Sequence, residues 1–149
     1  MKKVVVIGGS GFIGSHTADE LSKLGYNVTI FDRTPSPWLR ADQNMIEGDI
    51  LDVDSLDLGL RNADIVYHFA GVSDLNEASD RPLDAINLNI MGTALVLDAV
   101  SKLKVERFVY ASTMYVYSSY GSFYRATKQS AETLIEAYFE NMVQTRCLR

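Results

Sequence analysis

Tyr124 and Lys128 are four residues apart in the stretch YRATK, so on a helix their side chains lie on the same face, one turn apart. An ammonium group held near a phenol stabilises the phenolate, and a phenolate can exchange a proton with a substrate hydroxyl. The pair therefore predicts acid/base chemistry, with Tyr124 as the acid/base and Lys128 as the group that tunes it. The spacing alone is weak, because such pairs on helices are more often surface contacts.

Two hydroxyl side chains come shortly before this pair. Ser112 ends the run RFVYAS, and Thr113 follows it directly. If this run is a strand of a parallel sheet, Thr113 lies at the carboxyl edge, where open α/β proteins bind their ligands. Its hydroxyl can donate one hydrogen bond to a substrate oxygen and accept another. Thr113 is therefore the predicted third catalytic residue, and Ser112 competes for that role.

A glycine-rich stretch, GGSGFIG at residues 8–14, follows the apolar run 4–7 and precedes a helical pattern. The first backbone N–H groups of such a helix point across the loop, where a pyrophosphate can bind. Gly8 allows a tight exit from the strand, Gly11 lets the phosphates approach the backbone, and Gly14 permits close helix packing. The predicted cofactor contacts of this loop are Gly8, Gly11, Phe12, Ile13 and Gly14. An ordinary glycine-rich turn is the alternative.

Asp32 ends the second apolar run, VTIFD, and supplies the acid that such a loop requires. A carboxylate there can accept hydrogen bonds from both ribose hydroxyls of an adenosine. It also repels a 2′-phosphate, so the sequence favours NAD over NADP as the cofactor. Arg33 could bind that phosphate if Asp32 turned away, and it is included among the predicted cofactor contacts.

Short apolar runs alternate with longer amphipathic stretches along the chain. Strands are predicted at residues 3–7, 27–31, 44–47, 65–69, 107–112 and 145–148, and residues 34–42 are predicted to be a loop. Helices are predicted from about residue 12 to 24, after Pro82, and from 124 to 139. Their expected apolar faces are Ile13, Thr17, Leu21 and Leu24 in the first, Leu83, Ile86, Ile90, Ala94 and Leu97 in the second, and Ala131, Leu134, Ile135 and Tyr138 in the third.

This βαβα succession predicts an α/β fold: a doubly wound parallel sheet (Rossmann fold) with helices on both faces. The 149 residues are enough for one domain, and 47% of them are hydrophobic.

Composition excludes several function classes. The formal net charge is −5, and no block of Lys and Arg is present, so nucleic acid is not an expected partner. The apolar run 4–7 is too short for a signal peptide or a membrane span, so we expect no membrane contact and a cytoplasmic location. A single cysteine, Cys147, excludes an internal disulfide, and two distant histidines make a metal site unexpected.

Together these stretches resemble the extended short-chain dehydrogenase/reductases, and more narrowly their NAD-dependent epimerase/dehydratase branch, which acts on nucleotide sugars. The matching stretches occur in family order and cover the chain. They are GGSGFIG, Asp32, GDI at 48–50, HFAG at 68–71, NIMGT at 89–93, STMYVY at 112–117 and YRATK at 124–128. The resemblance implies transient oxidation: Tyr124 takes the proton of a sugar hydroxyl while the carbon gives hydride to NAD, and the ketone is then reduced on its other face or first loses water.

Further cofactor contacts are implied by the resemblance. Asp49 matches the acid that binds the adenine amino group, with the backbone of Ile50 beside it. The HFAG stretch, with Phe69, Ala70 and Gly71, matches the segment that passes the ribose and phosphates.

The resemblance also implies roles on the catalytic side. Tyr124 and Lys128 match the catalytic pair, and Lys128 is expected to hold the nicotinamide ribose as well. Thr113, rather than Ser112, matches the catalytic Ser/Thr. Asn89 matches a helix asparagine that is usually structural.

Three departures from the family concern the substrate side. Only six residues separate Tyr117 from Tyr124, where many members carry a longer loop, and Phe123 stands where proline is common. The chain ends at Arg149, whereas relatives continue into a substrate-binding region. We therefore expect residues 1–149 to be an NAD-binding Rossmann domain, with the C-terminal substrate-binding region absent from this chain.

Alternative functions and one further partner follow from the same residues. A reductase of the same fold that uses NAD or NADP on a non-sugar alcohol or ketone is one alternative, and a non-catalytic NAD-binding module is another. The helices at about residues 82–101 and 124–139 correspond to those that pair across the dimer in the family, which implies a homodimer.

Overall fold

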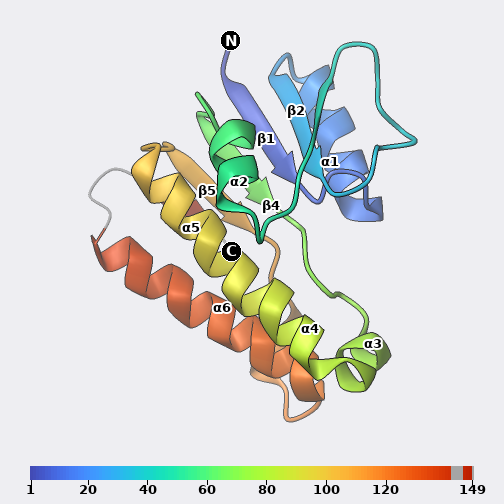
Figure 1. Cartoon of the computed structure of the whole chain (residues 1–149), viewed down its shortest axis with the longest axis vertical. Coiled ribbons are helices and arrows are strands. Elements are labelled where there is room, and N and C mark those ends of the chain that lie inside the picture. The colour runs from blue at the N-terminus through green and yellow to red at the C-terminus, as the bar shows by residue number, and fades with distance from the viewer. Residues whose placement is uncertain (142–145, 149) are drawn as a thin grey trace.

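Six parallel strands form one sheet in the order β3-β2-β1-β4-β5-β6, in a computed structural model that describes residues 1–141 and 146–148 (Figure 1). The strands are β1 (Lys3–Ile7), β2 (Asn27–Asp32), β3 (Asn44–Glu47), β4 (Ile65–His68), β5 (Arg107–Tyr110) and β6 (Arg146–Leu148). Each neighbouring pair is parallel, and the order changes direction between β1 and β4. The doubly wound fold and all six predicted strands are confirmed, with ends within two residues of those predicted; Thr145 lies outside the described residues.

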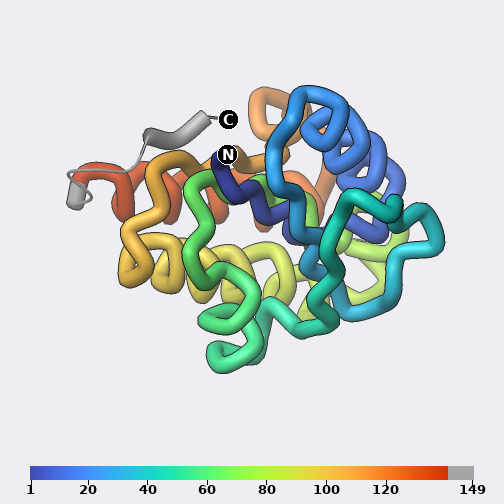
Figure 2. Tube along the Cα trace, turned by 90° about the horizontal axis from the view of Figure 1, so that it is seen from above, coloured from blue at the N-terminus to red at the C-terminus, as the bar shows by residue number. Residues whose placement is uncertain are grey.

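Helices cover both faces of the sheet. On one face lies α1 (Phe12–Lys23), and on the other lie α2 (Val53–Gly59) and α5 (Thr93–Lys102), as Figure 2 shows. Helix α5 continues α4 (Pro82–Ile86) and the π-helical turn η1 (Asn87–Gly92), and this long helix packs beside α6 (Ser122–Asn141). The short helix α3 (Leu75–Asp80) packs on α4 and α6, and the 3₁₀ turn η2 (Met114–Tyr117) precedes α6.

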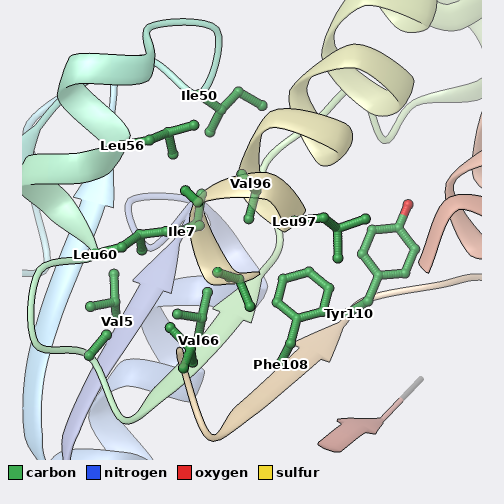
Figure 3. Packing of buried hydrophobic residues seen from close by; sticks show 14 of the residues in the cluster. Val5, Ile7, Ile50, Leu56, Leu60, Val66, Val96, Leu97, Phe108 and Tyr110 are labelled. Atoms are coloured by element: carbon green, nitrogen blue, oxygen red, sulfur yellow. The ribbon is translucent and has the colours of Figure 1, made fainter. Parts of the chain in front are cut away.

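The core has one layer on each side of β1, because successive side chains of a strand point to opposite faces. Val5 and Ile7 face the larger layer, which they share with Val66 and Phe108 under α5 (Figure 3). Val4 and Val6 face the smaller layer under α1, with Ala18, Leu21, Val28, Ile30 and Ile65. Residues 4–7 are all fully buried, which explains why this central strand is continuously apolar.

The predicted apolar face of α1 is wrong in part: Leu21 is buried as predicted, but two of its other members are exposed. Ile13 is 61% exposed and Leu24 is 74% exposed, whereas Gly14 and Ala18 are buried against the sheet. Small residues allow the helix axis to approach the strands closely, and a search for large apolar residues at helical spacing does not detect them.

The predicted face of the helix after Pro82 is also wrong in part. Leu97 is buried as predicted, but Leu83 is 77% exposed, and buried positions include Ala85, Asn89 and Val96. The π turn at Asn87–Gly92 inserts extra backbone and rotates the buried face, which a fixed 3.6-residue period does not allow for. The third helix is confirmed: Ala131 and Ile135 are buried, and Leu134 and Tyr138 pack against the core.

The helical stretch Pro82–Lys102 has a window of mean hydropathy 1.4, so by length and composition alone it could cross a membrane. In the structure it lies across the sheet, and Val96, Leu97, Ala99 and Val100 belong to the core. Burial within the domain accounts for its apolar character.

Candidate functional site

A pocket of about 500 Å³ lies at the carboxyl ends of the strands, where the strand order changes direction. Open α/β sheets bind their ligands at such a point. Of the predicted site residues, the pocket is lined by Gly8, Gly11, Phe12, Ile13, Gly14, Asp32, Arg33, Ile50, Phe69, Ala70, Gly71, Tyr124 and Lys128. The structure therefore brings residues from both ends of the chain into one pocket. Asp49 and Thr113 do not line it.

The glycine loop is closely packed between β1, β4 and α1. Gly8 has φ +79°, and a Cβ there would lie 2.5 Å from the backbone nitrogen of Ala70. A Cβ on Gly14 would lie 2.2 Å from the carbonyl oxygen of Gly8. Gly11 is the N-cap residue of α1 and has no side chain to cap the helix, so the positive end of the helix dipole faces the pocket. This cradle suits the phosphates of a dinucleotide.

Asp32, the last residue of β2, is held beside this loop. Its Oδ2 accepts a hydrogen bond from the backbone N–H of Ser10 (3.0 Å), and its Oδ1 accepts one from the N–H of Thr34 (3.2 Å). Oδ1 also accepts a hydrogen bond from the hydroxyl of Thr34 (3.3 Å), which a ribose hydroxyl could replace, and Oδ2 keeps a second acceptor position. Asp32 is thus oriented by the loop that would hold the adjoining phosphates.

Tyr124 and Lys128 reach the opposite end of the pocket from the first turns of α6. Lys128 is 6% exposed, and its Nζ donates a hydrogen bond to the carbonyl oxygen of Ala111 (3.0 Å). The same Nζ lies 6.0 Å from the centre of the Tyr124 ring. The Tyr124 ring is also contacted edge-on by Tyr115, with 6.2 Å between ring centres. The structure therefore places the ammonium beside the phenol, as the spacing predicted.

Burial lowers the pKa of Lys128 to about 8 from its usual 10.5. The cause is desolvation of the ammonium, because among the described residues Lys128 forms no ion pair. Both the charged and the neutral amine are therefore accessible close to neutral pH. An amine of this kind can move a proton or stabilise an anion with little change in pH.

Lys128→Met should raise the free energy of unfolding at pH 7 by up to about 3 kcal/mol. Burial lowers the pKa of Lys128 from 10.5 to about 8, and this difference corresponds to about that cost of burying the charged ammonium. Below pH 8 both the folded and the unfolded chain carry the proton, and the full cost of burying the charge applies. Between pH 8 and 10.5 the folded chain loses the proton first, so the wild-type chain gains stability and the difference from the variant closes. Urea unfolding at a series of pH values measures this.

The exposed lysine Lys23 provides the matched control. Lys23→Met removes the same charge from the surface, where Lys23 pairs with Glu20, and should change the free energy of unfolding by less than about 0.5 kcal/mol. A stability gain for Lys128→Met that stayed constant from pH 7 to pH 11 would show that desolvation of the ammonium is not its cause.

The two hydroxyl candidates are placed differently from the prediction. Thr113 is the N-cap residue of η2, and its Oγ1 accepts a hydrogen bond from the N–H of Tyr115 (3.3 Å). Ser112 lines the pocket, and its buried Oγ has no hydrogen-bond partner among the described residues. Thr113 stays a prediction, and the free hydroxyl of Ser112 makes it a closer competitor than the sequence indicated.

Asp49 is turned toward its own loop, where its Oδ1 accepts a hydrogen bond from the N–H of Leu51 (2.9 Å). Its neighbour Ile50 lines the pocket. Sequence reasoning missed Ser73 and Leu88 as lining residues. Ser73 follows the HFAG stretch by two positions and could have been found there, whereas Leu88 is placed by the π turn and had no signal in the sequence.

Asn89 joins the two halves of the pocket. Its Oδ1 accepts from the N–H of Val72 (2.8 Å), and its Nδ2 donates to the carbonyl of Val72 (3.0 Å) and to Oγ1 of Thr127 on α6 (3.0 Å). Thr127 in turn donates to the carbonyl of Tyr124 (3.0 Å). The structural role expected for Asn89 is thus to fix the segment after β4 to the helix that carries Tyr124.

Within residues 1–141 and 146–148, no group of three or more His, Cys, Asp or Glu side chains is arranged to hold a metal ion. The buried histidine, His68, instead bonds through Nε2 to Oγ1 of Thr93 (3.1 Å). Burial, together with the charge of Lys128, lowers the pKa of His68 to about 3, so it is neutral at physiological pH.

Comparison with known proteins gives concordant matches. The chain matches the model of the NAD dependent epimerase/dehydratase family over residues 4–149. It is 32% identical over 126 residues to the UDP-glucose 4-epimerase of Bacillus subtilis (strain 168), a match that covers 76% of this chain and 37% of that protein. It is 34% identical over 122 residues to the UDP-N-acetyl-alpha-D-glucosaminuronate decarboxylase of Bacillus cytotoxicus, with 78% of this chain and 38% of that protein covered.

Among solved structures, the UDP-glucose 4-epimerase from Brucella ovis in complex with NAD superposes with a TM-score of 0.91 at 27% identity. That match covers 100% of this chain and 51% of the other. The chain thus spans about half of that structure and little more than a third of the two curated relatives. The family match along nearly the whole chain and the agreement in fold show that this chain belongs to the NAD dependent epimerase/dehydratase family.

Proposed function

We propose that this chain binds NAD and supplies the acid/base residues of an enzyme that transiently oxidises a nucleotide sugar. The observation that carries the proposal is the single pocket that joins the glycine loop and Asp32 at one end to Tyr124 and Lys128 at the other. The residues fit the cofactor. Gly11 leaves room for phosphates beside a helix N-terminus, Gly14 allows that helix to pack closely on the loop, and Asp32 is held where an adenosine ribose would lie.

Each residue has a separate task in this proposal. Tyr124, as phenolate, takes the proton from a sugar hydroxyl and later returns it. Lys128 stabilises the phenolate and holds the nicotinamide ribose, and Thr113 positions the reacting hydroxyl. When bound, NAD supplies an acceptor for the hydride of the adjacent carbon and a donor that returns it. Ile50 and Leu88 contribute apolar surface to the pocket wall.

Epimerisation is the reaction that these residues support best. Among the residues that line the pocket, the only carboxylate is Asp32, at the end assigned to adenosine. Elimination of water calls for an acid beside the leaving hydroxyl, and this part of the pocket offers no carboxyl group for it. Reversal of configuration at a carbinol carbon needs the proton exchange at Tyr124 together with transfer of the hydride to bound NAD and its return to the opposite face of the ketone. The UDP-sugar relatives named above make a nucleotide sugar the proposed substrate.

We also propose that residues 1–149 are the NAD-binding domain and that a further region of the enzyme binds the sugar. A shallow apolar groove beside α1 supports this, because Phe12, Ile13, Leu24 and Tyr67 line it and the first three are exposed. Phe12 is 80% exposed and belongs to both this groove and the cofactor pocket. A region seated in the groove would therefore close the pocket as well.

Exposed apolar side chains on the paired helices support a homodimer. Leu83, Ile86 and Met91 on the Pro82–Lys102 stretch and Phe123 on α6 are all exposed. Two copies that packed these helices together would remove the side chains from water. A mass from light scattering at micromolar concentration measures the association. A cytoplasmic location remains the expectation, since the apolar run near the start of the chain is the buried strand β1.

Asp32→Ala should weaken NAD binding by about 1 to 3 kcal/mol, because it removes the acceptors for the ribose hydroxyls. Isothermal titration calorimetry with NAD measures this directly. Asp42→Ala is the matched control: it removes the same charge from an exposed loop residue that pairs with Arg40, outside the pocket. Unchanged NAD affinity in Asp32→Ala would remove Asp32 from the site.

The same titration distinguishes the other functions. Tighter binding of NADPH than of NAD, lost in Arg33→Ala, would favour the reductase of a non-sugar alcohol or ketone. A non-catalytic NAD-binding module needs Lys128 at most as a ribose contact and has no need for a phenol beside it, so the placement of Tyr124 next to Lys128 in the pocket argues against that function.

A further inference from the structure

The surroundings of Lys128 raise a question that the proposed chemistry leaves open, namely what keeps its ammonium group charged and fixed. Lys128 is 6% exposed, and among the described residues it forms no ion pair. One carbonyl, that of Ala111, accepts a hydrogen bond from it. An ammonium can donate three hydrogen bonds, so a single neutral acceptor leaves most of its charge uncompensated.

The ring of Tyr110 lies closest to this charge among the aromatic contacts. Nζ of Lys128 lies 4.7 Å from the centre of the Tyr110 ring and 6.0 Å from that of Tyr124. Tyr110 is 2% exposed, at the end of β5, and Ala111 follows it directly. The ring face and the accepting carbonyl therefore come from consecutive residues, and both are fixed by the sheet.

We propose that Tyr110 is a positioning residue for Lys128, whose ring face holds the ammonium group through a cation–π contact and directs it toward Tyr124 and the nicotinamide ribose. This positioning role rests on the proposed function, because Tyr110 acts on the reaction through Lys128. Cation–π attraction is strongest where water is excluded, and both side chains are buried here.

The contact involves the ring of Tyr110 and not its hydroxyl. The buried hydroxyl makes no hydrogen bond of good geometry with the described residues, and burial raises the pKa of Tyr110, so it stays a neutral phenol. The other titratable groups around Lys128 and Tyr110 are Tyr124 and Glu132 on α6 and His68 on β4. His68 is neutral above about pH 4 because burial lowers its pKa to about 3. Among the described residues no carboxylate forms an ion pair with Lys128, so the ring face of Tyr110 carries the contact.

The test measures the pKa of Lys128 itself, in the chain without cofactor or substrate. The six lysines can be labelled with ¹³C at Cε, and the Lys128 signal is identified by its absence in Lys128→Met. Phenylalanine, 4-fluorophenylalanine and 3,4,5-trifluorophenylalanine are placed at position 110. Fluorination weakens the negative ring face with little change of shape, so the fold is retained through the series.

The pKa of Lys128 should be close to wild type with Phe at position 110 and should fall stepwise with fluorination, by about half a unit to one unit in all. Tyr110→Leu should lower it by a similar amount. A pKa that did not change along the fluorinated series would overturn the proposal and leave Tyr110 with a packing role, which lowers the melting temperature without moving the pKa.

The outcome separates this inference from the proposed function. If the Lys128 pKa falls along the fluorinated series but calorimetry detects no NAD binding, the contact between Tyr110 and Lys128 is supported and the proposed function is wrong. If NAD binds and the pKa is flat along the series, the function stands and the positioning role of Tyr110 is wrong.

Discussion

Tyr124→Phe should lower turnover by about 100- to 10,000-fold in an enzyme that carries this chain together with its substrate-binding region, while NAD affinity stays the same. The substitution removes only the hydroxyl that would exchange a proton with the sugar, and a positioned acid/base contributes rate factors of that size. The ring remains in the pocket wall, so the cofactor site keeps its shape. Steady-state turnover of a UDP-sugar and calorimetry with NAD measure the two quantities separately.

The neighbouring tyrosine gives a matched control. Tyr115 contacts the Tyr124 ring edge-on and belongs to η2, but it is assigned no proton transfer. Tyr115→Phe should therefore keep turnover within a few-fold of wild type. Retained activity in Tyr124→Phe would contradict the acid/base assignment. Equal losses of turnover in both variants would indicate that the packing of the two tyrosines, and not proton transfer, is what turnover depends on.

Gly14→Ala should destabilise the fold by about 1 to 3 kcal/mol and abolish measurable NAD binding. A Cβ at this position would lie 2.2 Å from the carbonyl oxygen of Gly8 and 2.8 Å from Cα of Gly9, so helix α1 must move away from the loop. Forcing a methyl group against backbone atoms costs roughly 1–3 kcal/mol of stability. This cost exceeds the gain expected from the higher helix propensity of alanine. Urea unfolding and NAD calorimetry together measure the effect.

Gly11→Ala separates the two roles of glycine in this loop, which are close packing of helix α1 and access of the phosphates to the backbone. Gly11 has φ −77°, which alanine adopts freely, and the nearest atom to its Cβ would be the Gly8 carbonyl oxygen at 3.4 Å. The free energy of unfolding should therefore change by less than about 0.5 kcal/mol. The new methyl group would lie where phosphates approach, so NAD binding should still weaken. A fully stable Gly14→Ala variant with normal NAD affinity would contradict the packing derived for this loop.

The two pairs of variants test opposite ends of one pocket. The glycine pair reports on the cofactor end, and the tyrosine pair reports on the reacting end. The hydrogen bonds of Asn89 to Val72 and Thr127 connect these ends through the protein. Each pair of variants should therefore be assessed by the quantity that its own end controls, which is NAD affinity for the glycines and turnover with NAD bound for the tyrosines.

The sequence by itself determined the strands, their alternation with helices and the fold class. Local periodicity decides these features, because a central strand such as residues 4–7 is apolar throughout and a helix that packs on the sheet has an apolar stripe along one face. Motif spacing also placed the glycine loop, Asp32 and the Tyr124–Lys128 pair in the right order. Their chemistry depends on residue type and on separations of a few positions, which are visible without a fold.

Only the tertiary structure decided which faces were buried and what surrounds each functional group. Gly14 and Ala18 replace Ile13 and Leu24 on the buried face of α1, because the distance between helix and sheet is set by segments remote in the chain. Thr113 and Ser112 differ by one position in sequence, and the backbone turn at η2 decides which hydroxyl faces the pocket. The low pKa of Lys128 arises from the burial of its ammonium group at the end of β5. Desolvation and close contact depend on the whole fold, so no local pattern could have predicted them.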